Sequence, residues 1–114
     1  MQFERRRSQR IFMRIPGRIY GSRSDKSVIY EEVATDTVSA YGALLNVQET
    51  YDTGMHLLFT NLVTEEEIPC RVVSVGENKA GQKQVAIEFT VASPKFWRIH
   101  FPPPGEKPLK KSTG

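Results

Sequence analysis

The segment Val85-Ala86-Ile87-Glu88-Phe89 decides the class of fold, because its large apolar side chains occupy every second position. A period of two predicts a strand with one buried face. Further strand-like runs precede it and are separated by polar or glycine-containing loops: residues 15–20, 28–38, 43–47, 55–60 and 67–76. Short strands divided by turn signals roughly every ten residues predict an all-β fold, an antiparallel sandwich or barrel.

One short helix is predicted after the last strand. Ser93 is a suitable N-cap, and Pro94 suits the first helical position. Trp97 and Phe101 are four residues apart and would share one helical face. The prolines that follow would end the helix, and the lysine-rich segment 102–114 has almost no apolar residues, so we expect a disordered basic tail.

Length and composition indicate one soluble domain. The chain has 114 residues, of which 39% are apolar and 25% are charged. It contains no apolar stretch near the roughly 20 residues that span a bilayer, and no signal-peptide core, so we expect a cytoplasmic protein. The single cysteine, Cys70, excludes an internal disulfide and lies in a strand-like run, which favours a buried structural thiol.

Positive charge is concentrated near the N-terminus. Residues 1–14 hold five arginines and one acidic residue, namely Glu4, Arg5, Arg6, Arg7, Arg10 and Arg14. The net charge of the whole chain is +3, so the remaining residues are close to neutral. Few apolar residues precede Ile11, and we therefore expect residues 1–14 to form a flexible arm. Guanidinium groups bind phosphate or a guanine edge through two hydrogen bonds, so this arm is a candidate anion site.

The segment Asp36-Thr37-Val38-Ser39-Ala40-Tyr41-Gly42 is the second candidate. By itself it could be a simple turn, in which Ser39 bonds the backbone and Gly42 adopts a positive φ. Its chemistry also suits a nucleotide. Asp36 could accept hydrogen bonds from a guanine, Ser39 offers a hydroxyl to phosphate or ribose, and Gly42 would allow close approach to the backbone.

Together the two segments resemble the PilZ domain family, which is marked by an RxxxR motif followed by a (D/N)xSxxG motif. The first is Arg6-Arg7-Ser8-Gln9-Arg10, and the second is Asp36 to Gly42, continued by Ala43-Leu44-Leu45. The segment Val85–Phe89 is similar to a late strand of the family, although Ala86 stands where a glycine is common. The resemblance extends from about Arg5 to Phe101.

This resemblance implies a six-stranded antiparallel β-barrel of the split-barrel type over residues 11–101, with a short C-terminal helix. It also implies a receptor for the ligand cyclic di-GMP, which would lie on the outside of the barrel under the arginine arm. The implied ligand-binding residues are Arg6, Arg10, Asp36, Ser39 and Gly42, with Arg5 and Arg7 secondary. Binding would order the arm and alter a surface that a downstream protein partner recognises.

Other functions remain open on the sequence. The domain could be a protein-interaction module that does not use the nucleotide, or a small basic barrel for single-stranded nucleic acid. The latter needs exposed aromatic residues on one strand face, whereas Tyr20, Tyr30, Tyr41 and Tyr51 are scattered along the chain. We expect no enzyme, no cofactor and no metal, because His56 and His100 have no ligand-spaced neighbours and no catalytic set is evident.

Overall fold

The computed structural model describes residues 9–101. The predicted arm residues Arg5, Arg6 and Arg7 and the predicted tail 102–114 lie outside the described residues. Seven strands follow one another along the described part of the chain: β1 (Ile11–Phe12), β2 (Pro16–Ser22), β3 (Val28–Ser39), β4 (Gly42–Asn46), β5 (His56–Asn61), β6 (Glu66–Glu77) and β7 (Lys83–Phe89).

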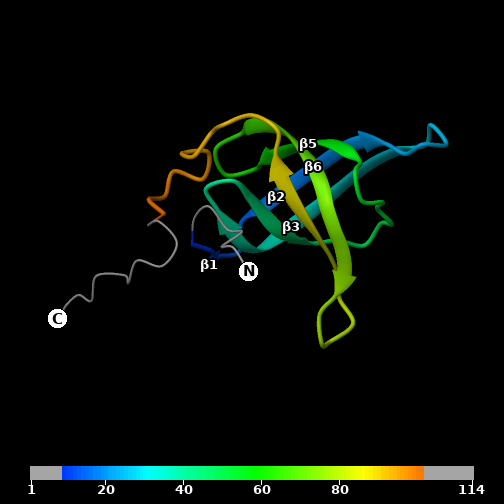
Figure 1. Cartoon of the computed structure of the whole chain (residues 1–114), viewed down its shortest axis with the longest axis horizontal. Coiled ribbons are helices and arrows are strands. Elements are labelled where there is room, and N and C mark those ends of the chain that lie inside the picture. The colour runs from blue at the N-terminus through cyan, green and yellow to red at the C-terminus, as the bar shows by residue number, and fades with distance from the viewer. Residues whose placement is uncertain (1–8, 102–114) are drawn as a thin grey trace, which may run out of the picture.

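Six of these strands close into a barrel (Figure 1). The neighbours run in the order β3, β2, β5, β6, β7, β4, and β4 pairs again with β3. Every pairing is antiparallel. The predicted six-stranded antiparallel barrel is therefore confirmed. The short strand β1 was not predicted, and it pairs with the C-terminal part of β3.

Alternating side chains of the strands fill the interior of the barrel. The most deeply buried members are Ile19, Val38, Leu45, Phe59 and Val72, each at 0% exposure. Cys70 is 1% exposed, and burial raises the pKa of its thiol to about 12, so the predicted buried structural cysteine is confirmed.

The C-terminal helix predicted from Ser93 is wrong for the described residues, which form turns there. The Phe96 N–H donates to the Ser93 carbonyl at 3.0 Å, and the Arg98 N–H donates to the Lys95 carbonyl at 2.9 Å. A positive φ of 63° at Arg98 then ends the turn. The physical reason is the left-handed backbone at Arg98, which a right-handed helix does not accommodate, together with the packing of Phe96 and Trp97, both 4% exposed, on the core.

The two aromatic residues of this turn lie against the core. The Trp97 and Phe59 rings are 5.6 Å apart between centroids, and the Phe96 and Phe89 rings are 5.3 Å apart. These edge-to-face contacts fasten the C-terminal turn to the barrel. No helix among residues 9–101 is long and apolar enough to cross a membrane.

Candidate functional site

The beginning of the described chain is attached to β3 by a buried threonine. Ile11 and Phe12 pair with Val38 and Thr37, after which the ladder is interrupted. At the interruption the Thr35 hydroxyl, in a residue 1% exposed, accepts the Ile15 N–H at 2.8 Å and donates to the Met13 carbonyl. Thr35 thus satisfies two backbone groups that the ladder leaves unpaired and fixes the base of the predicted arm.

Asp36 is the extra residue of a β-bulge. The pairing of β3 with β4 shifts between Thr35 and Thr37, so Asp36 has no partner across that edge. The alternation of burial breaks close to this point, because Thr37 and Val38 are consecutive and both buried. Asp36 is partly exposed, and its carboxylate makes no hydrogen bond or ion pair with any residue of the described range 9–101. Bulges commonly redirect a side chain next to a functional site.

Arg10 reaches the same end of the barrel. It directly precedes β1, and continuing the β1–β3 register by one residue places its backbone beside Ser39. Arg10 is exposed, and within residues 9–101 its guanidinium has no ion-pair partner. Of the predicted ligand residues, the structure therefore brings Arg10 next to Ser39, at the end of β3 that also carries Asp36.

The turn from Ser39 to Gly42 is held firmly by its neighbours. The Ser39 Oγ accepts the Tyr41 N–H at 3.2 Å, and the Ser39 carbonyl accepts the Trp97 indole N–H at 2.9 Å. The Phe89 N–H donates to the Tyr41 carbonyl at 2.8 Å. The sequence predicted this turn but not its attachment to Trp97, 58 residues away from Ser39.

Gly42 is required by packing. A Cβ at this position would lie 2.0 Å from the Ile87 carbonyl oxygen and 3.2 Å from the Glu88 Cα. Its φ is not in the left-handed region, in contrast to Gly54 and Gly81. The close approach that a glycine permits here is therefore the approach of strand β7 to β4.

One residue that the sequence analysis did not single out also lies at this site. Phe12 in β1 is 83% exposed, and it lies two positions from Arg10, so both face the same side of the strand. An exposed aromatic ring beside a guanidinium offers a surface on which a base could stack. The exposure could have been suspected from the arginine-rich surroundings, but the register of β1 is what places the ring beside Asp36 and Thr37.

The described residues include no group of three or more histidine, cysteine, aspartate or glutamate side chains that could hold a metal ion. The site consists instead of a basic side chain, a carboxylate, a hydroxyl and an aromatic ring on a rigid backbone. Such a set offers a positive charge, hydrogen-bonding groups and a ring surface for stacking.

Comparison with known families gives one match over nearly the whole chain. The sequence profile described as the PilZ domain matches residues 4–100. No match was found among curated proteins.

Three solved structures share the fold. The PilZ domain with c-di-GMP of YcgR from Escherichia coli is 16% identical with a TM-score of 0.60, and the alignment covers 83% of this chain and 85% of that one. The PilZ domain of CeSA from a cellulose-synthesizing bacterium is 22% identical with a TM-score of 0.53, covering 74% and 82%. The inhibitor of motility MotI (DgrA) from Bacillus subtilis is 16% identical with a TM-score of 0.61, covering 80% of this chain; the chain spans less than half of MotI, 44%.

Proposed function

Because this chain belongs to the PilZ domain family, we propose that it is a receptor domain for cyclic di-GMP and has no catalytic role. The observation that carries the proposal is that Arg10 lies beside Ser39, at the end of β3 that also carries Asp36, and that the charged side chains of Arg10 and Asp36 lack partners in the described range. The similarity to the PilZ domain of YcgR, a structure with c-di-GMP, supports the same ligand.

The ligand carries two phosphodiester charges and two guanines. Arg10, together with Arg6 of the arm, would bind phosphate or the O6 and N7 edge of a guanine. The Asp36 carboxylate would accept the N1 and N2 hydrogens of a guanine, and the lack of a partner for it among residues 9–101 supports this role. Each charge-assisted hydrogen bond contributes about 1.5–3 kcal/mol, so a few such contacts reach the roughly 8 kcal/mol of micromolar binding.

Ser39 would have two roles. Its oxygen accepts the Tyr41 N–H, which leaves the hydroxyl proton to be donated to a phosphate oxygen of the ligand. For Gly42, packing against β7 supports an architectural role in place of a direct contact. Arg5 and Arg7 would add longer-range attraction from the arm.

Binding would also order the arm over the outside of the barrel. The arm continues from Arg10, which directly precedes β1, so a ligand held by Arg10 and Asp36 would draw the preceding arginines toward the Ser39–Gly42 turn. A protein partner would then recognise the arm and this end of the barrel as one surface.

The test is calorimetric titration of cyclic di-GMP into the full chain and into Arg10→Ala, Asp36→Asn and Arg6→Ala. We expect each substitution to weaken binding at least about tenfold, which corresponds to 1.4 kcal/mol. Arg14→Ala is the matched control, because Arg14 is also an exposed arginine without an ion-pair partner in the described range. Absence of wild-type binding, or equal losses in Arg14→Ala and Arg10→Ala, would contradict the proposal.

Binding of single-stranded nucleic acid is an alternative function, and the exposed tyrosines of the barrel provide a direct test of it. The tyrosines are less scattered than expected, since Tyr20 and Tyr30 lie opposite each other on β2 and β3 with ring centroids 6.2 Å apart. Both are more than half exposed, yet they pack edge to face against each other and form no ladder for successive bases. A gel shift with single-stranded DNA that survives moderate salt and is lost in Tyr30→Ser would favour this alternative.

A further inference from the structure

A cavity of about 410 Å³ opens directly beside the Ser39–Gly42 turn. Ala40 of that turn forms one wall, and the C-terminal turn forms the other: Pro94, Lys95, Arg98, Ile99, His100 and Phe101. The volume lies within the range of small-molecule sites. Among residues 9–101 its lining combines apolar side chains with Lys95, Arg98 and a histidine and includes no acidic residue, which suits an anionic ligand with a flat ring.

The two walls are tied together at the cavity. The Trp97 indole N–H donates to the carbonyl of Ser39, the residue before Ala40. Trp97 is also 4% exposed and packed on the core, so the C-terminal turn has a fixed position relative to the candidate ligand residues. A ligand bound by Ser39 would therefore meet the cavity lined by Lys95 and Arg98 without any rearrangement of the backbone.

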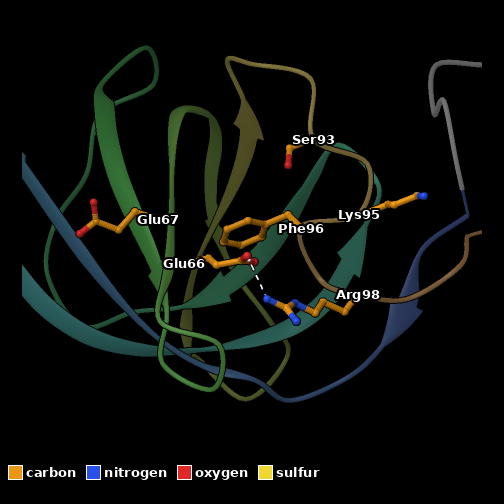
Figure 2. Close-up of a pocket in the computed structure, with 6 residues that line it drawn as sticks. All are labelled: Glu66, Glu67, Ser93, Lys95, Phe96 and Arg98. Carbon is orange, nitrogen blue, oxygen red and sulfur yellow. Dashed lines mark hydrogen bonds and ion pairs between the residues drawn. The ribbon is translucent and has the colours of Figure 1, made fainter.

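Arg98 also lines a second, more acidic cavity on its other side (Figure 2). There its guanidinium contacts the Glu66 carboxylate at 2.9 Å, while Lys95 extends away from this pair. Both members of the ion pair are well exposed, with side-chain exposures of 61% for Arg98 and 46% for Glu66. Exposed pairs of this kind contribute little to stability, so Arg98 can exchange Glu66 for another anion at low cost.

We propose that the cavity beside Ala40 is a second part of the nucleotide site, in which Lys95 and Arg98 bind a phosphate of cyclic di-GMP and Arg98 leaves Glu66 to do so. The inference rests on the proposed function, because the ligand is the one assigned there to Arg10 and Asp36. Arg98 gains charge-assisted hydrogen bonds to a phosphate in exchange for a solvent-screened pair. The apolar walls, Ile99 and Phe101, give the adjoining guanine ring a surface to contact.

The substitutions that test this are chosen to preserve the fold. Arg98→Asn removes the charge while tolerating the positive φ of that residue. Lys95→Ala removes the second cation of the cavity, and Glu66→Gln removes the competing anion. Lys79→Ala, in the exposed β6–β7 loop, is the control for loss of a lysine. Glu49→Gln, which breaks the exposed Arg23–Glu49 pair, is the control for loss of a carboxylate.

Cyclic di-GMP is titrated into the full chain, with heat and the fluorescence of Trp97, the one tryptophan of the sequence, as readouts. We expect Arg98→Asn and Lys95→Ala each to weaken binding by about three- to tenfold, and Glu66→Gln to strengthen it by about twofold, with both controls at the wild-type value. Wild-type binding with unchanged affinity in Arg98→Asn and Lys95→Ala would overturn this inference and leave the proposed function standing. No wild-type binding at all would overturn both.

Discussion

The segment from Asp36 to Gly42 and the two protruding hairpin loops differ in how they use their carboxylate and amide side chains. In the β2–β3 loop the Asp25 carboxylate accepts the Ser27 N–H at 2.9 Å and the Ser27 hydroxyl at 2.6 Å. In the β6–β7 loop the Asn78 amide oxygen accepts two backbone N–H groups, those of Ala80 and Gln82. These loops therefore depend on their own polar residues for their shape.

At the Ser39–Gly42 turn the Ser39 Oγ also bonds locally, to the Tyr41 N–H, but the surrounding backbone is held by residues of other segments. Thr35 holds the base of the arm, and Trp97 donates to the turn itself. As a result the Asp36 carboxylate makes no hydrogen bond or ion pair with a residue of the described range, and the Arg10 guanidinium has no ion-pair partner there. A charged side chain near a turn therefore becomes available to a ligand when other residues hold the backbone in place.

The largest difference between the two regions should appear on adding a methyl group to a glycine. In Gly42→Ala the new Cβ would lie 2.0 Å from the Ile87 carbonyl oxygen, whereas in Gly76→Ala, near the β6–β7 loop, it meets nothing within 4 Å. We expect Gly42→Ala to lose about 3 kcal/mol of unfolding free energy or more, lowering the melting temperature by roughly 12–24 °C.

Gly76→Ala is the matched control for this prediction and should stay within about 0.5 kcal/mol of wild type. Both changes are measured by thermal unfolding without ligand. Equal melting temperatures for the two variants would show that β7 does not approach Gly42 as closely as the structure indicates, and would return Gly42 to a role in ligand contact.

A smaller loss is expected from Thr35→Val. The valine has the same shape but leaves the Ile15 N–H and the Met13 carbonyl without their buried partner. We expect a loss of about 2 kcal/mol and faster hydrogen exchange of the Ile15 amide, since an unsatisfied buried group costs about 1–3 kcal/mol. Thr53→Val, at an exposed loop position, is the control and should change neither quantity. An unaltered Ile15 exchange rate would show that the Thr35 hydroxyl does not hold the backbone at Ile15.

The sequence predicts the structural features that depend on neighbouring residues better than those that depend on contacts between distant segments. Two strand predictions fell within two residues of the observed ends, because both rest on local signals: a run of β-branched and aromatic residues for β3 and period-two alternation for β7. Strand β1 was missed, since its two residues become a strand only by pairing with Val38 and Thr37, far along the chain. The helix prediction was wrong because the local caps were outweighed by burial of Phe96 and Trp97 on the core.

The same limit applies to the candidate site. The spacing of Asp36, Ser39 and Gly42 predicted the turn, and the site roles assigned to them remain predictions. What the sequence could not give were the contacts between distant segments. The bulge at Asp36 depends on β4, the packing of Gly42 depends on Ile87, and the basic cavity depends on the return of residues 94–101 to Ala40.

Asp25 offers the smallest effect and the closest counterpart of Asp36. The Ser27 hydroxyl and then the Ser27 N–H stabilise its carboxylate, which holds the pKa of Asp25 below its ordinary value. A folded-state pKa that is depressed contributes stability above the unfolded pKa, and this stability is lost as pH falls through the folded pKa. We therefore expect the wild-type melting temperature to fall more steeply below about pH 4 than that of Asp25→Asn.

Substitution of the two aspartates should have opposite effects: one should lower the melting temperature and the other should weaken ligand binding. Asp25→Asn should slightly lower the melting temperature at neutral pH and leave cyclic di-GMP affinity unchanged, because its hydrogen bonds serve the loop alone. Asp36→Asn should leave the melting temperature in place and lose affinity. Parallel acid limbs for wild type and Asp25→Asn, measured by thermal unfolding from pH 3 to 7, would mean that Ser27 does not stabilise the carboxylate. Asp25 would then not stabilise its loop, and the difference proposed between Asp25 and Asp36 would not hold.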